Sequence, residues 1–311
     1  MNKINKYKLR IQTLVLMSFL FASFFTISSC DTDETQTVAT FTNLTMSDEF
    51  DVEGAPNSEI WNYDTGTGID GWGNNELQYY TDRSENVTVQ NGLLVISAIE
   101  ENYNGSSFTS AKLVTKGKFS QAYGRFEARI KVPGGSGLWP AFWLLGENVD
   151  VDGWPQCGEI DIMEYRRQEP TKVSGSIHGP GYSGLTDPQG QVTKSYDLGN
   201  DRYDAGFHVF GIEWSPDYIN YYIDDVLYNQ ITPSDIEVTP ADAVYILNDG
   251  VAATADTEAI PGTDITGDWV FNKPFYIIIN LAVGGNFPGN PDSGETFPQN
   301  MLVDYVRVYK Q

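Results

Sequence analysis

The chain has 311 residues, enough for one large all-β domain or for two ordinary domains. It carries 42 Asp and Glu against 19 Lys and Arg, so its net charge is −23 at pH 7. A surface of that sign repels phosphate backbones and anionic lipid, which makes nucleic acid a poor partner and disfavours strongly acidic polymers. The 7 Trp, 18 Tyr and 16 Phe suit either sugar rings or the core of a large sheet protein.

The N-terminal segment predicts export. Residues 1–10 are basic without an acid, and residues 11–27 are mostly apolar, which is the layout of a secretory signal peptide. The apolar run ends in Ile27-Ser28-Ser29-Cys30, which resembles the bacterial lipobox, whose cysteine is diacylated and becomes the first residue of the mature chain. A plain transmembrane anchor is the alternative, but a run of about 17 residues is at the lower limit for a spanning helix.

These features divide the chain into a lipoprotein signal peptide at residues 1–29, a polar acidic tether at 30–40 and one folded domain at 41–311. The tether has no apolar periodicity. Its acids directly after Cys30 resemble a signal for display on the outer surface. We therefore expect a monomer in the cell envelope, held at the outer membrane by its lipid alone and exposed at the surface.

Residues 41–311 consist of short apolar runs between Gly, Pro and Asn, and no segment keeps a helical apolar stripe for three turns. We predict strands at 93–99, 111–119, 123–132, 138–145, 158–165, 173–178, 207–214, 219–228, 275–283 and 302–309. So many strands in one domain predict an all-β fold, a β-sandwich jelly roll of the concanavalin A-like kind, with two curved antiparallel sheets and a concave cleft. Residues 235–268 are expected to form a long acidic surface loop.

One predicted strand, at 158–165, carries three acids. Glu159 and Asp161 share a face because side chains alternate along a strand. Strict alternation would bury Glu164 at a cost on the order of several kcal/mol. A β-bulge at Ile162-Met163 removes this conflict, because it returns Glu164 to the face of the other two acids.

Three carboxylates in a row indicate acid–base chemistry. The Cα atoms of Glu159 and Glu164 would lie about 13 Å apart, and side chains leaning together would bring the carboxyls to about 5–6 Å. A retaining glycosidase needs about 5–5.5 Å. Such crowding raises at least one pKa, which keeps one acid protonated at neutral pH. The alternative is a calcium or magnesium site, because clustered acids also bind hard cations.

Six motifs along the predicted domain carry a family resemblance. They are GWGNNELQY at 71–79, YGRFEAR at 123–129, GLWPAFW at 137–143, WPQCGEIDIMEY at 154–165, FYIIINLAVGG at 275–285 and VDYVRV at 303–308. Together they resemble the laminarinase-like branch of glycoside hydrolase family 16, in which the additional Met163 marks the bulged form. The resemblance implies retaining endo-hydrolysis of β-1,3-glucan, with Glu159 as nucleophile, Glu164 as general acid/base and Asp161 as assistant.

The resemblance also implies a set of substrate-binding residues that line the cleft. They are Asn74, Glu127, Arg129, Trp139, Trp143, Trp154, His178 and Asn280. Indoles stack on sugar faces, while the Glu127/Arg129 pair and the Asn amides anchor hydroxyls. Any of these Trp can equally be a core residue, Trp143 first among them, and His178 can simply cap a strand. We expect Cys157 to be a buried free thiol behind the acidic strand.

No cofactor is expected for catalysis, but the resemblance implies a structural Ca²⁺, because many relatives of this kind carry one on the convex face. Asp304 matches the usual side-chain ligand, and Glu49 and the carbonyl of Gly92 stand in matching contexts. The alternative is that Asp304 is an ordinary acid on an edge strand.

Other functions remain open at this point. The same chemistry can act on mixed-linkage β-1,3-1,4-glucan or a galactan such as agar, or transfer the sugar to another sugar. A non-catalytic glucan-binding surface lipoprotein is a rival of another class, although a pure binder does not need a crowded row of carboxylates. The long segment 235–268 leaves the reach of the cleft open.

Overall fold

The computed structural model describes residues 41–184, 192–238, 245–246, 252–253 and 265–311. The predicted signal peptide, the tether, Cys30 and most of the predicted 235–268 loop lie outside the described residues. Residues 41–311 form one compact unit. Within the described ranges, no helix has the length and apolar character that crossing a membrane requires.

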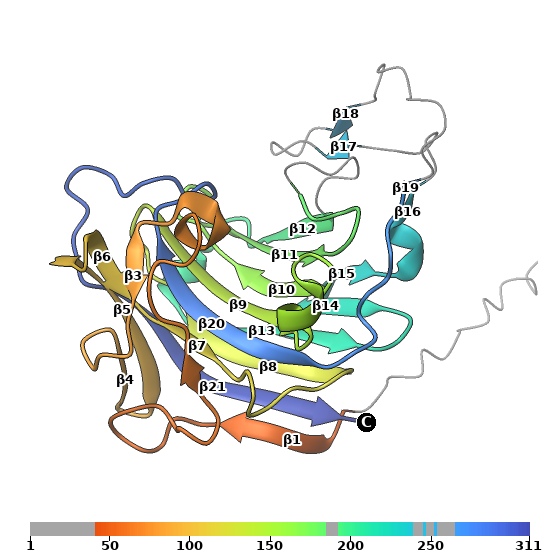
Figure 1. The fold of residues 1–311 in the computed structure, drawn as a ribbon, viewed down its shortest axis with the longest axis horizontal. Coiled ribbons are helices and arrows are strands. Elements are labelled where there is room, and N and C mark those ends of the chain that lie inside the picture. Colours follow the sequence, from red (N-terminus) through yellow and green to blue (C-terminus); the bar gives the residue numbers. More distant parts are fainter. Residues whose placement is uncertain (1–40, 185–191, 239–244, 247–251, 254–264) are drawn as a thin grey trace, which may run out of the picture. The chain divides into compact units, whose positions relative to one another are not determined.

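The larger of two sheets, which we call sheet A, has ten strands in the order β15-β14-β13-β8-β21-β5-β6-β3, with β1 on β21 and β4 on β5 (Figure 1). Its strands are β1 (Asn43–Asp48), β3 (Gln78–Tyr80), β4 (Val87–Gln90), β5 (Leu93–Tyr103), β6 (Ser106–Ser110), β8 (Gly124–Lys131), β13 (His208–Trp214), β14 (Ile219–Ile223), β15 (Val226–Ile231) and β21 (Gln299–Lys310). The pairings are antiparallel except that of β3 with β6.

The second sheet, sheet B, has seven strands in the order β12-β11-β10-β9-β20-β7-β2. Its strands are β2 (Asn62–Tyr63), β7 (Lys112–Val114), β9 (Leu138–Gly146), β10 (Glu159–Glu164), β11 (Lys172–His178), β12 (Val192–Asp197) and β20 (Phe275–Val283). Two short ladders pair β16 (Glu237–Val238) with β19 (Ile265–Thr266) and β17 (Tyr245–Ile246) with β18 (Ala252–Ala253). The described helical turns are η1 (Gly71–Asn75), α2 (Val149–Asp152), η2 (Tyr203–Ala205) and η3 (Pro233–Asp235).

The two sheets curve and pack face to face (Figure 1). Apolar side chains from both sheets fill the space between them, with Phe126 and Ile212 from sheet A and Ile160 from β10 fully buried. Tyr221 reaches across this core and donates a hydrogen bond to the Ser176 carbonyl of β11 at 2.8 Å. The predicted β-sandwich of two curved, antiparallel-rich sheets is confirmed.

Two predicted strands differ from the structure. The range 219–228 is not one strand but the hairpin of β14 and β15, because Asp224 and Asp225 adopt φ values of 50° and 62° and reverse the chain. Aspartate tolerates this left-handed region, which two-residue hairpin turns require. The range 111–119 ends early, since Lys118 and Phe119 donate main-chain hydrogen bonds back to the Thr115 carbonyl.

The entry into β10 depends on Gly158. Its φ is +76°, and a Cβ built there would lie 2.8 Å from Cζ of Phe275. A larger residue is therefore disfavoured by both backbone and space. The preceding Cys157 is a buried free thiol, as predicted, and burial raises its pKa to about 11.

Candidate active site

A β-bulge shapes the acidic strand β10. Opposite β9, the chain advances two residues from Asp161 to Met163 while its partner advances one, from Trp143 to Phe142. Ile162 and Met163 are both buried in the core between the sheets. The predicted bulge is therefore confirmed, and Glu164 lies on the outer face of sheet B with Glu159 and Asp161.

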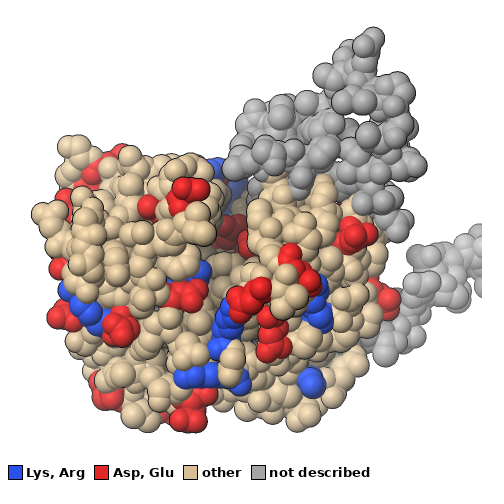
Figure 2. All heavy atoms as spheres, in the orientation of Figure 1, with Lys and Arg blue, Asp and Glu red and all other residues tan. Residues whose placement is uncertain are grey.

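The outer face of sheet B, which we call the cleft face, carries its side chains in rows across the strands. The row through Asp161 contains Val114, Ile278, Trp143, Asp161, Ser176 and Thr193. The row through Glu164 contains Lys112, Asn280, Ala141, Glu164, Ser174 and Ser195. Glu159 lies between Leu145 and His178. Figure 2 shows the molecular surface hollowed, with acidic and basic atoms inside the hollow.

Each outer glutamate accepts a hydrogen bond from an indole. Trp154 donates its Nε1–H to Oε2 of Glu159 at 3.0 Å. Trp139 donates its Nε1–H to Oε1 of Glu164 at 3.1 Å. Each indole thus binds one oxygen of its carboxyl, and the other oxygen of Glu164, Oε2, accepts from the Ser176 hydroxyl at 3.5 Å.

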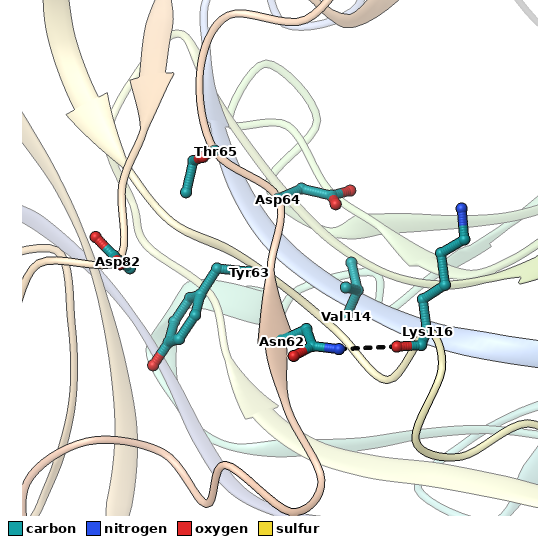
Figure 3. Close-up of a pocket in the computed structure, with 7 residues that line it drawn as sticks. All are labelled: Asn62, Tyr63, Asp64, Thr65, Asp82, Val114 and Lys116. Atoms are coloured by element: carbon teal, nitrogen blue, oxygen red, sulfur yellow. Dashed lines mark hydrogen bonds between the residues drawn. The ribbon is translucent and has the colours of Figure 1, made fainter.

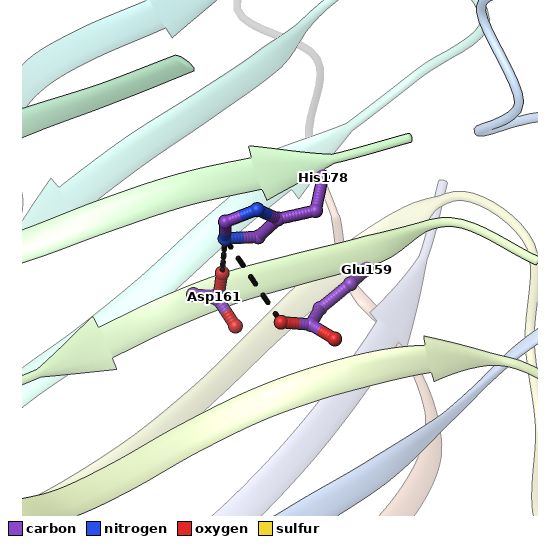
Figure 4. A group of neighbouring side chains, drawn as sticks. All are labelled: Glu159, Asp161 and His178. Atoms are coloured by element: carbon purple, nitrogen blue, oxygen red, sulfur yellow. Dashed lines mark ion pairs between the residues drawn. The ribbon is translucent and has the colours of Figure 1, made fainter. Parts of the chain in front are cut away.

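His178 on β11 is the cation of this cluster (Figure 4). Its Nε2 lies 3.1 Å from Oδ2 of Asp161 and 4.0 Å from Oε1 of Glu159. Its Nδ1 lies 3.1 Å from the carbonyl oxygen of Ser183, which can only accept, so Nδ1 carries a proton. Burial alone lowers the pKa of His178, but the hydrogen bond and charge of Asp161, with the charges of both glutamates, raise it to about 10. His178 is therefore an imidazolium at neutral pH.

The three acids share this one imidazolium, and their pKa values rise. Burial first, and then the charge of Asp161, raise the pKa of Glu164 to about 8. Burial and the charge of Glu159 raise the pKa of Asp161 to about 7. Burial also raises the pKa of Glu159, while the His178 charge opposes the rise. Glu164 is thus protonated at neutral pH, as a general acid must be.

Comparisons with known proteins agree with this geometry. Residues 72–270 match the model of glycosyl hydrolases family 16. The chain is 41% identical over 271 residues to the beta-glucanase of Rhodothermus marinus, covering 86% of this chain and 85% of that protein. The chain belongs to glycosyl hydrolase family 16. It is a glycoside hydrolase.

Two further relatives extend the family assignment. The glucan endo-1,3-beta-glucosidase of Cryptopygus antarcticus is 37% identical over 278 residues, covering 86% of this chain and 91% of that protein. The solved endo-beta-1,3-glucanase of Pyrococcus furiosus is 43% identical with a TM-score of 0.72, covering 86% of this chain and 94% of that one. The sandwich described above is therefore the fold of a family 16 enzyme.

Most of the predicted substrate-binding residues of this family 16 enzyme lie at the cleft. Trp143 and Asn280 are on the cleft face, where Trp143 donates its Nε1–H to Oδ1 of Asn280 at 2.7 Å. Trp143 is therefore not part of the core between the sheets. Trp154 is 49% exposed, and Trp139 packs against Phe287 with ring centroids 5.0 Å apart. These indoles can offer a ring face to a sugar.

Asn74, another predicted substrate-binding residue, lies in η1. Its carbonyl oxygen accepts a hydrogen bond from the main-chain N–H of Asn286, at 2.8 Å. This bond ties η1 to the segment that follows β20, the strand that carries Asn280. The loop around Asn74 is thus bonded to the segment that follows the end of β20.

Glu127 and Arg129 are not in the cleft, and that prediction is wrong. Both lie on β8 of sheet A, where Phe126 and its alternate neighbours fill the core, so the two charged side chains face outward from sheet A. Glu127 pairs with Arg125 at 2.7 Å and Arg129 with Asp304 at 2.6 Å. Strand alternation predicts that these side chains lie on a solvent-exposed face, but it does not tell which of the two sheets the strand belongs to.

Two residues at the cleft, Lys112 and Glu76, were missed from the sequence. Lys112 stands in the row of Glu164, with its Nζ 4.3 Å from the Trp72 ring, 5.1 Å from the Trp143 ring and 3.2 Å from Oδ2 of Asp64. Glu76 accepts hydrogen bonds from two neighbours in the same region. A lysine between Ala111 and Leu113, and the glutamate inside the 71–79 motif, were the available signals.

The row through Asp161 continues to the edge of sheet B. Asn62 of β2 lies opposite Val114 of β7. An open cavity of about 490 Å³ is found there (Figure 3), lined by Asn62, Tyr63, Asp64, Thr65, Asp82, Val114 and Lys116. The cleft face therefore extends beyond the carboxylates with polar side chains.

The residues predicted to hold calcium are partly engaged by arginines. Both oxygens of Glu49 accept from Arg307, at 2.9 and 2.8 Å, and Oδ2 of Asp304 accepts from Arg129. Gly92 offers only its carbonyl oxygen. The Asp304 carboxylate can bind a cation only if the ion replaces Arg129 as its partner. Because both side-chain oxygens of Glu49 are bonded to Arg307, Glu49 can offer only its main-chain carbonyl oxygen.

The cleft acids also resemble a metal site, as the sequence allowed. One ligand atom each from Glu159, Asp161 and His178 lie within 4.8 Å of one another. An imidazolium has no lone pair for a metal, and with a pKa of about 10 His178 is protonated at neutral pH. The cluster therefore fits an acid–base site better than a cation site.

Proposed function

We propose that this family 16 enzyme is a retaining endo-β-glucanase that hydrolyses β-1,3 linkages of a laminarin-type glucan, in the degradation of polysaccharide. The observation that carries the proposal is the bulge in β10, which sets a protonated Glu164 on the same face as Glu159. The names of the relatives from Rhodothermus marinus and Cryptopygus antarcticus support the substrate class.

In the first step Glu159 attacks the anomeric carbon while Glu164 gives its proton to the leaving glycosidic oxygen. The Trp139 N–H occupies Oε1 of Glu164, so Oε2 carries that proton. The Trp154 N–H holds Oε2 of Glu159, which leaves Oε1 for attack. Glu164, now ionised, then takes a proton from water, and the resulting hydroxide releases the sugar from Glu159.

Asp161 and His178 tune the nucleophile. The imidazolium lies 4.0 Å from Glu159, and its charge opposes the rise in the pKa of that carboxyl. Asp161 holds the imidazolium at 3.1 Å, and its carboxyl shares a hydrogen bond with Glu159. The imidazolium therefore favours the ionised nucleophile in a place where burial favours the neutral form.

The test is a product profile on laminarin, lichenan and agarose, with the anomeric configuration of the first products followed by NMR. We expect oligosaccharides from laminarin, with the β-configuration retained. Products from lichenan alone would assign the enzyme to mixed-linkage glucan, and products longer than the substrate would indicate transfer. Laminarin binding without any cleavage would replace the proposal with a binding protein, and an inverted product would overturn the two-step mechanism.

We also propose that the chain is a lipoprotein of the outer membrane, acylated at Cys30. The lipobox-like Ile27-Ser28-Ser29-Cys30 supports this location. The wild type should incorporate labelled fatty acid and sediment with membranes, while a Cys30→Ser variant should do neither. Equal sedimentation of the two chains would contradict the anchor, and protease treatment of whole cells tests surface exposure.

A structural Ca²⁺ is proposed at Asp304, with the main chain of Glu49 and Gly92. Strand pairing supports it: Asp48 lies opposite Val306 and Leu94 opposite Val303, which places the ends of β1 and β5 along the same part of β21. Chelator should lower the Tm of the wild type and Ca²⁺ should restore it, but neither should affect Asp304→Asn. A wild-type Tm that does not respond to chelator would exclude the site.

A further inference from the structure

Glu76 is a carboxylate near the cleft that the mechanism above does not use. It follows η1 and is half-buried beside β3. Desolvation raises its pKa to about 7, although hydrogen bonds from Gln78 and Tyr80 and the charge of Lys112 lower it. Its position is determined by hydrogen bonds that reach it from two directions.

A chain of hydrogen bonds runs from the cleft face to Glu76. Trp143 donates its Nε1–H to Oδ1 of Asn280 at 2.7 Å, and Asn280 donates its Nδ2–H to the Tyr80 hydroxyl at 3.0 Å. The hydroxyl of Tyr80 then donates to Oε2 of Glu76 at 3.4 Å. A second chain runs from the main-chain N–H of Val283 through Gln78 to the same oxygen, at 2.7 and 2.6 Å.

Both chains have a fixed direction. An indole N–H and a main-chain N–H can only donate, and the carboxylate of Glu76 can only accept at pH values above its pKa, where it is ionised. Every group between these ends therefore has one orientation. In particular, the amide of Asn280 must turn its oxygen toward Trp143 and its nitrogen toward Tyr80. Linked hydrogen bonds of this kind also polarise and strengthen one another.

Glu76 also acts on Lys112 through its charge. Lys112 is almost buried between two indole rings on the cleft face and has Asp64 as its ion-pair partner at 3.2 Å. A buried ammonium needs negative charge around it. Glu76 supplies part of that negative charge and so stabilises the Lys112 ammonium in its position beside Trp143.

We propose that Glu76 is a positioning residue for glucan binding, which fixes Asn280 and Trp143 through the hydrogen-bond chain and Lys112 through its charge. The inference rests on the proposed function, because it takes the ligand of the cleft face to be a β-glucan. Trp143 stands directly opposite Asp161 on the neighbouring strand, so its orientation sets one wall beside the reacting carboxylates. Glu76 itself need not touch the sugar.

Two conservative variants test the inference. Glu76→Gln offers an N–H as well as an oxygen and removes the charge beside Lys112, while Tyr80→Phe removes only the hydroxyl that joins Asn280 to Glu76. Each should weaken binding of laminarin oligosaccharides about fivefold to tenfold, as expected for the loss of one linked hydrogen bond. In the active enzyme, KM should rise by that factor and kcat should change by less than about twofold.

Affinity is measured by calorimetry in the Glu159→Gln background, so that binding is followed without turnover, and KM and kcat are measured in the active enzyme. The double variant Glu76→Gln/Tyr80→Phe should lose less than the product of the single losses, because both changes break one chain. Glu59→Gln, an exposed glutamate, is the matched control and should bind as the wild type does.

The outcomes separate the two proposals. If the wild type neither binds nor cuts laminarin, the proposed function fails and this inference fails with it. If the wild type is active and Glu76→Gln keeps its affinity, or loses only Tm, the inference alone is overturned. Multiplicative losses in the double variant, or normal binding by Tyr80→Phe, would also overturn it, since Glu76 would not then act through the chain.

Discussion

The two outer faces of the sandwich both carry acids, but only one of them supplies enough cations. On sheet A, Arg125 pairs with Glu127, Glu213 and Asp225. Arg307 and Arg129 hold two further acids on that sheet. On the cleft face, the three acids of β10 share the single imidazolium of His178 among the described residues, with Lys112 in the next row.

Strand alternation determines which face of a sheet an acidic side chain lies on. The number of cations beside that side chain then determines its pKa and so its chemical role. Where guanidinium groups meet carboxylates, burial lowers the pKa of Arg125, but Glu127 and Asp225 raise it further. Where burial is greater and cations are few, the pKa of Glu164 rises to about 8. One face is an ion-pair network and the other can exchange protons.

The largest expected effect comes from exchanging one glutamate on each face. Glu164→Gln removes the proton donor and should lower kcat on laminarin by about 10²–10⁴-fold. Glu213→Gln, the matched change on sheet A, removes a charge paired with Arg125 at 3.2 Å and should leave kcat within about twofold. Release of reducing ends measures both, with circular dichroism as the check on folding. Similar losses in the two variants would end the distinction between the faces.

Removing His178, the cation of the acidic cluster, should have the next largest effect. In His178→Gln, Glu159 loses the charge that opposes the rise in its pKa. Because Glu159 must be ionised to attack, the acid limb of kcat/KM should move to higher pH. A full pH–rate profile of variant and wild type measures the shift. An acid limb that stays in place would mean that His178 does not set the charge of the nucleophile.

The wild-type profile itself sharpens the contrast. Glu164 must be protonated to donate, and its pKa is raised to about 8 by burial and the charge of Asp161. The rate should therefore fall as pH rises through about 8, by about tenfold for each unit beyond it. The measurement is kcat/KM between pH 5 and 10 at constant ionic strength. A rate that holds level to pH 10 would assign the proton donor to another group.

Much of this contrast was predictable from the sequence, and the limits have physical causes. The bulge followed from the cost of burying Glu164 under strict alternation, which is a local argument. Glu127 and Arg129 were placed in the cleft by resemblance alone, and alternation along β8 could not correct this because it does not tell which sheet β8 joins. Pairing with β13 and β21 places the strand in sheet A, and the paired residues are 78 or more positions apart in the chain, beginning with Ile130 and His208.

The missed hairpin and Glu76 have a related cause. An apolar run from Ile219 to Tyr228 reads as one strand unless Asp224 and Asp225 are taken as a turn with positive φ. Glu76 accepts hydrogen bonds from Gln78 and Tyr80, and these two residues are bonded in turn by Val283 and Asn280 of β20. Hydrogen bonds between such distant segments form only after the sheet is assembled, so no local pattern predicts them.

A smaller effect of opposite sign is expected for stability. Glu164 has a folded pKa of about 8 against an ordinary value of 4.5, so between these pH values the folded chain holds a proton that the unfolded chain has released. Stability is therefore lost as pH rises through this window. Glu164→Gln is neutral in both states and should be more stable than the wild type at pH 8, by about 1 kcal/mol or more. Urea unfolding at pH 4 and pH 8 measures this, and a variant less stable at pH 8 would contradict it.

The smallest effect is predicted for Arg129, and it separates the two faces most directly. Arg129→Ala removes a half-exposed ion pair with Asp304 on sheet A, and such pairs contribute about 0–1 kcal/mol. KM and kcat on laminarin should stay as in the wild type, whereas Lys112→Met, which removes a cation from the cleft face, should raise KM. Because both changes delete one positive charge from a strongly acidic chain, a general electrostatic effect on a neutral glucan would move the two KM values together. If KM rises as much for Arg129→Ala as for Lys112→Met, the assignment of Arg129 to the ion pairs of sheet A is wrong, and Arg129 contributes to substrate binding.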